Sequence, residues 1–432
     1  MIVPIGLPGT LVARPGWMAR RRRSLQLFAL AAGPGILVML GENDGPSMLS
    51  YAATGAAYGV GFFVPFILLT FAMAYVVQEM IVRVGIATGR GHADLIRHRF
   101  GPRWSALTTL DLAVGNLLTL VTEFIAVRAG AAYFGVPPAV AVGSALALVV
   151  LANVLRRYVT WERAVLVLAL GNLVFVPAAL NAQLDPAALG NALWSWGPLP
   201  GGVSTAFLTL ILANVGATVT PWMLFFQQSA VVDKGLTAAD LGKARLDTGV
   251  GAALAAAAGI AALATAAVLF THHVDASSFS TGADFATALR PFIGVHGAAL
   301  FALGMIEAGM VAALTISASS GYTVGEVAAS PGAGRTRNRP AFAATAIASA
   351  VFAAATVLIP NAPLLAISIG VNVIAALLMA PALVFALLLA NDGALMGRLR
   401  NNRAANIASG AVVVTIAALG GLYAVLLILP KH

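Results

Sequence analysis

Residues 40–47 read Leu40-Gly41-Glu42-Asn43-Asp44-Gly45-Pro46-Ser47 and interrupt what would otherwise be one long apolar helix. Hydrocarbon offers no hydrogen-bond partners to a loosened backbone, so such an interruption at membrane depth must line a cavity or be covered by protein. The interruption also contains two carboxylates, and an ionisable side chain at the bilayer centre costs at least roughly 2.5–3.5 kcal/mol on insertion scales. We therefore expect the substrate to bind at this interruption.

The composition is that of an integral membrane protein. Of the 432 residues, 60% are hydrophobic and only 9% are charged. Several apolar runs approach the roughly 20 residues that span a bilayer as a helix. The chain has no cysteine, which excludes disulfides, iron–sulfur clusters and zinc–thiolate sites. We see no nucleophile with an adjacent base and no cofactor motif, so we expect neither an enzyme nor a bound cofactor.

We predict eleven spans, approximately 24–58 (broken), 61–82, 106–133, 138–155, 161–181, 201–232 (broken), 246–271, 285–325, 341–360, 362–390 and 404–429. Most of the 25 basic residues fall in connections on one side, beginning with the run Arg20-Arg21-Arg22-Arg23 before the first span. This bias predicts a cytoplasmic N-terminus and an outside C-terminus. The net charge of +9 is then a topology signal, and we expect no nucleic-acid partner.

The first and sixth spans carry matching interruptions. Gly41 to Pro46 and Gly216 to Pro221 both have glycine and proline five residues apart. The sixth span comes five spans after the first, an odd number, so the two enter the membrane in opposite directions. Paired broken helices in inverted repeats indicate a secondary transporter. We predict an all-α membrane protein with a 5+5 inverted repeat and an amino-acid-transporter-like fold. Its parts are a leader (1–23), two repeats (24–181 and 201–390) and a peripheral span (404–429).

Oxygen donors dominate the two interruptions. Unwound carbonyls and the C-terminal ends of half-helices attract cations. Asp44 adds a negative charge, Glu42 a second, and Ser47 and Thr220 offer hydroxyls. Neither interruption contains Cys, Met or His, so the set favours Mg2+, Ca2+, Mn2+ or Na+ over softer late transition metals. No phosphate-loop motif is present, which leaves ATP-driven transport without support.

The combination of motifs resembles the NRAMP metal transporters. Gly33-Pro34-Gly35 followed by Gly41, Asp44 and Gly55-Ala56 is similar to the family's first span. Gly216-Ala217-Thr218-Val219-Thr220-Pro221-Trp222 is similar to its sixth span. The resemblance covers about residues 24–425 and implies the inverted-repeat fold and alternating access. It places Asp44 on the family's metal-binding Asp.

The departures from that family bear on the substrate. Ser47 stands where the family has a binding Asn, Thr220 where it has a Met, and Trp222 where it has a His. Met379 falls where a tenth-span Gln is common. Losing the sulfur removes a reason to prefer Mn2+, Fe2+ or Cd2+, and Thr220-Pro221-Trp222-Met223 resembles the NRAMP-related magnesium transporter branch. We expect Mg2+ first and Mn2+ second, with Asp44 as principal ligand, assisted by Glu42, Ser47, Thr220 and the Ala217 carbonyl.

Two other readings stay open. Ser47 and Thr220 also suit a relative that no longer moves divalent metals and carries a monovalent cation or a small amine. A non-transporting receptor or a channel is a third class. Glu42 either supplies a second ligand or proton site, or stays protonated or paired and shapes the cavity.

Further membrane acids are candidates for the pathway or for proton coupling. Asp111, Glu123 and Glu307 have this role beside Trp222, and for each acid a structural pair is an equal alternative. Protons are therefore a candidate partner beside the lipid bilayer and the cation, and the oligomeric state stays open. Arg128 is expected to bond another span, and the loop histidines, His92 among them, are expected to be solvated.

Overall fold

The computed structural model describes residues 33–155, 158–197, 204–328 and 338–428, and these fold almost entirely into helices with no strand among them. Within these described ranges, nine helices are long and apolar enough to cross a membrane, and Pro138–Val154 is a shorter apolar helix. The broken first span adds two half-helices, α2 and α3. The all-α membrane fold is therefore confirmed. The predicted leader 1–23 lies outside the described residues, and the division into two repeats stays a prediction.

The helices run in the order predicted. Their bounds are α2 Pro34–Glu42, α3 Gly45–Tyr58, α4 Phe63–Thr88, α5 His92–Phe100, α6 Pro102–Tyr133, α7 Pro138–Val154, α8 Tyr158–Ala169, η1 Leu170–Val174, α9 Phe175–Asn181, α10 Pro186–Ser195, α11 Thr205–Gly216, α12 Pro221–Lys234, α13 Leu241–Thr271, α14 Gly282–Val327, α15 Arg339–Val357, α16 Leu364–Asn391, α17 Gly393–Met396 and α18 Arg403–Ile428. The predicted span 161–181 is thus interrupted by the 3-10 turn η1.

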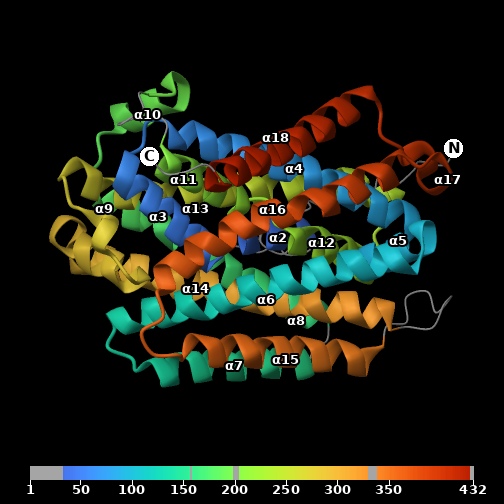
Figure 1. The fold of residues 1–432 in the computed structure, drawn as a ribbon, viewed down its shortest axis with the longest axis horizontal. Helices are drawn as coiled ribbons and strands as arrows, with labels where there is room; N and C mark the ends of the chain where they lie inside the picture. Colours follow the sequence, from blue (N-terminus) through green and yellow to red (C-terminus); the bar gives the residue numbers. More distant parts are fainter. Residues whose placement is uncertain (1–32, 156–157, 198–203, 329–337, 429–432) are drawn as a thin grey trace, which may run out of the picture.

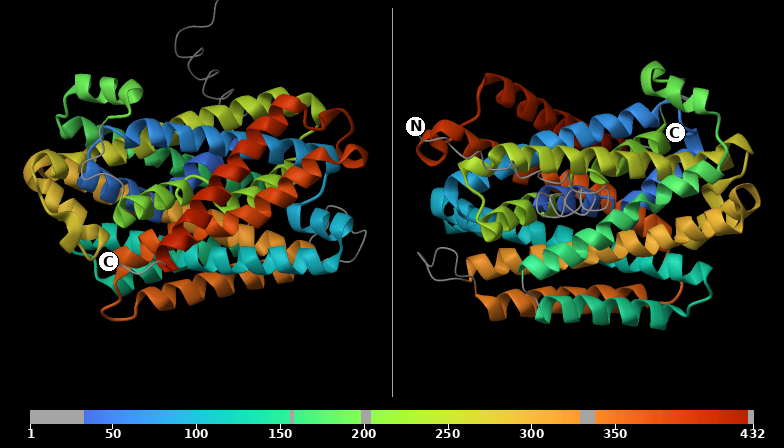
Figure 2. Two further views of the ribbon diagram at one scale, coloured as in Figure 1. Left: turned by 45° about the horizontal axis from the view of Figure 1, so that its top comes forward. Right: turned by 180° about the vertical axis from the view of Figure 1, so that it is seen from behind.

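The long helices lie roughly along one axis, with the half-helices among them (Figures 1 and 2). Helices α6 and α14 pack along their lengths, and α7 and α15 pair on one flank. Helix α16 crosses the middle of the bundle obliquely, and α18 packs against it on the opposite side (Figure 1). Helix α5 lies at one end of the bundle and α10 at the other (Figure 1). We call these the α5 end and the α10 end.

Both predicted interruptions are present. Helix α2 ends at Glu42, and α3 begins at Gly45 with Asp44 as its N-cap. Helix α11 ends at Gly216, and α12 begins at Pro221 with Thr220 as its N-cap. Proline suits the first turn of a helix because the amide hydrogen it lacks would have no helical acceptor there. The two glycine–proline spacings therefore mark the restart of a helix in each span.

The second interruption is packed tightly against span 10. A Cβ atom on Gly216 would lie 1.8 Å from the carbonyl oxygen of Asn372 on α16. Real Cβ atoms do not approach an oxygen this closely, so only glycine lets α11 end where it does. The close approach fixes the position of the chain that follows, which includes Ala217 and Thr220.

Candidate functional site

Asp44 lies at the centre of the site and keeps one oxygen free. Its side chain is 1% exposed. Oδ1 accepts hydrogen bonds from the Ser47 amide at 2.9 Å and from the Ser47 hydroxyl. Oδ2 has no hydrogen-bond partner among the described residues. Asp44 thus caps α3 by accepting the Ser47 amide, and its second carboxylate oxygen is available to a ligand.

Glu42 joins the two interruptions directly. The Thr220 hydroxyl donates to Glu42 Oε1 at 2.6 Å, while Oε2 has no partner in the described part of the chain. Residues 178 positions apart in the sequence therefore meet in one hydrogen bond. The predicted opposition of the first and sixth spans is present at the level of side chains.

Glu123, expected only as a pathway residue, belongs to the same cluster. It comes from α6 and accepts the Gly45 amide on Oε2 at 2.9 Å, while Oε1 has no partner within the described ranges. Its carboxyl group also interacts with that of Asp44. The site therefore contains three buried carboxylates, each with one oxygen that has no hydrogen-bond partner among the described residues: Glu42, Asp44 and Glu123. None of the three forms an ion pair with a basic side chain among the described residues. The same part of the chain holds no group of three His, Cys, Asp or Glu side chains arranged to hold a metal ion by themselves.

Ala217 and Trp222 build the walls of the site. The Tyr51 hydroxyl donates to the Ala217 carbonyl at 3.3 Å. Trp222 is buried, and a Cβ on Gly41 would lie 3.4 Å from its ring, so the indole packs on the end of α2. Trp222 therefore closes one side of the interruption.

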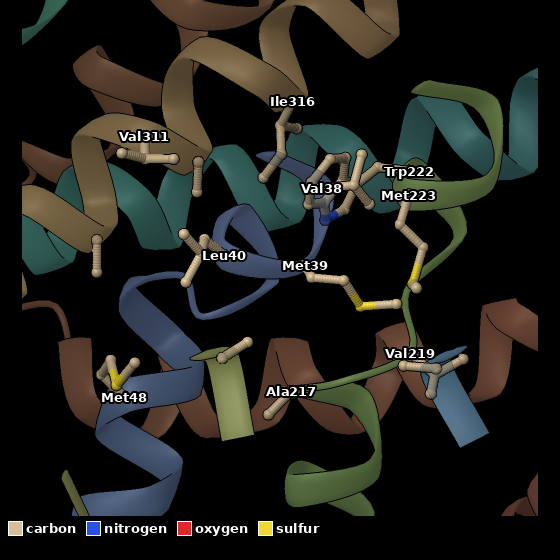
Figure 3. Close-up of a cluster of buried hydrophobic side chains, with 14 of the residues drawn as sticks. Val38, Met39, Leu40, Met48, Ala217, Val219, Trp222, Met223, Val311 and Ile316 are labelled. Atoms are coloured by element: carbon tan, nitrogen blue, oxygen red, sulfur yellow. The ribbon is translucent and has the colours of Figure 1, made fainter. Parts of the chain in front are cut away.

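Met223 is a site residue that sequence reasoning missed. Its sulfur accepts the Thr220 amide at 3.4 Å, and its side chain extends from α12 toward the space beside Met39 of α2 (Figure 3). Neither interruption contains a Met, yet a residue in the first turn of a helix reaches back over its N-cap. Met223 therefore places a sulfur next to the second interruption, and the turn after Pro221 was the available signal.

The other predicted acids lie apart from this cluster. Asp111 is half-buried on α6, several turns before Glu123. Glu307 is buried on α14 and faces η1. Arg128 donates to the Val357 carbonyl at 2.6 Å, which confirms the expectation that it bonds another span.

A second unpredicted contact closes the α5 end of the first span. Asp247 of α13 accepts the amides of Gly33 and Gly35 at 2.7 and 2.8 Å. A carboxylate at this position satisfies the free amides of α2 and its positive dipole end. Lys234 lies beside Asp247 and pairs with Glu162 of α8 at 3.2 Å. These residues tie α2, α8, α12 and α13 together.

His92 is not solvated, contrary to expectation. It is 0% exposed at the start of α5, where Nδ1 lies 2.7 Å from Gln228 Oε1. Gln228 Nε2 donates to the Arg90 carbonyl, so Oε1 is the acceptor and His92 Nδ1 carries the proton. Burial lowers the pKa of His92 to about 4 because water no longer stabilises the charged ring.

A family model described as natural resistance-associated macrophage protein-like (Nramp) matches residues 35–426. The chain belongs to the Nramp family. This Nramp chain is 29% identical over 302 residues to the "Divalent metal cation transporter MntH" of Ralstonia nicotianae, covering 66% of each chain. It is 25% identical over 312 residues to the protein of that name from Pectobacterium carotovorum, covering 70% of this chain and 73% of that one. Membership confirms the resemblance and the expectation that the chain is not an enzyme.

Solved structures agree on the fold of this Nramp chain. A manganese transporter from Eremococcus coleocola matches with a TM-score of 0.72 at 17% identity, covering 95% of this chain and 88% of that one. The nucleobase-cation symporter MHP1 matches with a TM-score of 0.55 at 16% identity, covering 91% of each. At these identities the likeness establishes the fold alone.

Proposed function

We propose that this Nramp chain moves a divalent metal cation across a bacterial-type inner membrane by alternating access. The relatives named above as divalent metal cation transporters support this reading. The observation that carries it is the free Oδ2 of Asp44, buried between two broken helices in a cluster with the acids Glu42 and Glu123. A cluster of buried negative charge without a basic partner among the described ion pairs is stabilised by a cation.

The ligand set favours Mn2+ over Mg2+. Mg2+ prefers oxygen ligands and retains several waters, whereas a thioether sulfur suits softer metals. The Met223 sulfur, which accepts the Thr220 amide, supplies such a donor at the second interruption. Mn2+ is therefore the first substrate to test, and Mg2+ is the second.

The α5 end is proposed to face the cytoplasm, because the basic connections gather there. In that orientation the contacts of Asp247 with Gly33 and Gly35 hold the first half-helix against α13 on the cytoplasmic side. Release of α2 would open a path from Asp44 to that side. Glu123 is proposed to accept a proton when the metal leaves, since its free oxygen lies next to Asp44.

Metal uptake into proteoliposomes tests this function. Asp44→Ala should abolish saturable uptake of Mn2+ and Mg2+, and Asp44→Asn, which keeps the shape of the side chain, should do the same in a protein that still melts cooperatively. Asp275→Asn, a change at an exposed loop residue, is the matched control and should leave uptake intact. Full uptake by Asp44→Ala would overturn the assignment of the ligand. No saturable binding of either metal by the unaltered protein would favour the alternative of a monovalent cation or small amine.

A further inference from the structure

Glu307 is a buried acid that the site around Asp44 does not use. It lies on α14, is 7% exposed, and faces the 3-10 turn η1. A Cβ on Gly171 would lie 2.9 Å from Glu307 Cγ, so the glycine makes room for this side chain. Neither carboxylate oxygen has a hydrogen bond of normal geometry within the described residues. The turn η1 and helix α14 thus enclose a carboxylate that lacks a fixed partner.

Asn172 adds a third oxygen to this place. It follows Gly171 in η1, is fully buried, and its side chain interacts with the Glu307 carboxyl. Asn172 Nδ2 donates to the Asn43 carbonyl at 3.0 Å, which fixes the orientation of the amide. Asn172 Oδ1 is left without a partner in the described part of the chain. Asn172 Oδ1 and both Glu307 oxygens are therefore without a hydrogen bond of normal geometry among the described residues, and the Asn172 amide group is the polar neighbour of the carboxylate.

Among the described residues, no ion pair joins a basic side chain to the Glu307 carboxylate. Arg128, on the neighbouring helix α6, donates to the Val357 carbonyl. Arg290 of α14 lies about five turns away and is exposed. A buried polar group without a partner costs about 1–3 kcal/mol, and a charged one costs more. A bound cation would remove this cost for all three oxygens at once.

We propose that Glu307 and Asn172 form a sodium-ion site separate from the Asp44 centre. The donors are hard oxygens, which bind alkali and alkaline-earth cations in preference to softer metals. One carboxylate matches a single positive charge, whereas Ca2+ sites usually gather several. The close contact between Gly171 and Glu307 favours the smaller Na+ over K+. Buried water and the loosened carbonyls of η1 complete the coordination.

The sodium site is linked to the first interruption through Asn43. Asn43 accepts from Asn172 through its carbonyl and donates to the Ala255 carbonyl at 2.7 Å through its side chain. It stands between Glu42 and Asp44 in the chain. A cation bound between Asn172 Oδ1 and Glu307 fixes the orientation of the Asn172 amide, which donates to the Asn43 carbonyl. Binding of Na+ at this site and binding of a ligand at Asp44 should therefore change each other's affinity by the same factor.

Binding of radioactive 22Na+ to the purified full-length protein, counted by scintillation proximity, tests the proposal without any transport step. The unaltered protein should bind 22Na+ saturably, with excess unlabelled Na+ competing and K+ competing far less. Glu307→Gln keeps the shape but loses the charge, and should weaken binding at least roughly tenfold, which corresponds to about 1.4 kcal/mol. Asn172→Ala is a second variant and should weaken binding in the same direction.

Two further variants separate this site from the proposed metal site. Asp44→Asn should keep 22Na+ binding while losing Mn2+ binding, and Asp275→Asn, at an exposed loop residue outside both clusters, should keep both. The proposal is overturned if the unaltered protein shows no saturable 22Na+ binding, if K+ competes equally, or if folded Glu307→Gln and Asn172→Ala bind Na+ normally. None of these outcomes depends on whether Mn2+ is transported.

Discussion

The buried ring of His92 should make the protein sensitive to acid in a defined pH window. The ordinary histidine pKa is about 6.5, and burial lowers that of His92 to about 4. Between these values the unfolded chain binds a proton that the folded chain excludes. The stabilisation is therefore fully present above pH 6.5 and is lost as the pH falls toward 4.

The size of this effect follows from the two pKa values. Each unit of difference is worth about 1.36 kcal/mol, so the whole window corresponds to about 3 kcal/mol. Between pH 7 and pH 5 the loss should be about 2 kcal/mol of unfolding free energy. The structural cause is that protonation adds a charged N–H at Nε2, which lies in a buried site with no partner among the described residues.

Thermal unfolding of the purified protein at pH 7 and pH 5 measures this sensitivity. His92→Gln should retain a donor toward Gln228 and should lose less melting temperature on acidification than the unaltered protein, by roughly 2–4 °C. His98→Gln changes an exposed histidine of the same helix and should behave like the unaltered protein. An equal acid shift in His92→Gln and the unaltered protein would refute the reasoning. It would mean that burial of the His92 ring does not set the acid sensitivity of the folded protein.

Three shorter predictions concern the site and its packing. Met223→Leu should raise the Mn2+ concentration for half-maximal uptake roughly tenfold with a smaller effect on Mg2+, whereas Met379→Leu on α16 should change neither. Asp247→Asn removes the charge that holds α2. Because the chain has no native cysteine, Ile36→Cys introduces a single thiol, which should react with a membrane-impermeant maleimide roughly tenfold faster in the Asp247→Asn background than with Asp247 present. An unchanged rate would argue against a gate at this end of α2. Gly216→Ala places Cβ 1.8 Å from the Asn372 carbonyl and should cost at least about 3 kcal/mol, seen as lost folded yield, whereas Gly410→Ala, which meets nothing within 4 Å, should fold normally.

The interruptions could be predicted because their signals are local. Proline at position 46 or 221 cannot donate a backbone hydrogen bond, and the glycine five residues earlier weakens the helix in which it stands. Both effects act on the segment that carries these residues. Periodicity and length gave the order of the spans for the same reason. The 3-10 turn η1 was missed because Leu170–Val174 has no residue that by itself forbids an α-helix.

The partners of the buried polar groups could not be predicted, because they come from distant parts of the chain. Asp247 caps an amide 214 residues away, and His92 meets a glutamine 136 residues away. Polarity near a loop indicated exposure for His92, yet α5 folds back against α12 and buries it. Which acid meets which donor depends on helix rotation, and the low amphipathicity of spans buried on all sides leaves that rotation unspecified.

Two departures from the family pattern that look independent in the sequence form one contact in space. The extra acid Glu42 accepts the hydroxyl of Thr220, the residue that replaces the family's Met. Thr220→Met alone would leave Glu42 Oε1 without its donor, which costs about 1–3 kcal/mol when a buried acceptor is orphaned.

We therefore expect Thr220→Met to lower the melting temperature and metal uptake, and Glu42→Leu with Thr220→Met to recover stability beyond the sum of the single changes. Unfolding of the two single variants and the double variant measures this coupling. Additive changes in unfolding free energy would show that Glu42 and Thr220 do not stabilise each other. Coupling of about 1–3 kcal/mol would show that the acid and the hydroxyl act as one unit that joins the two interruptions.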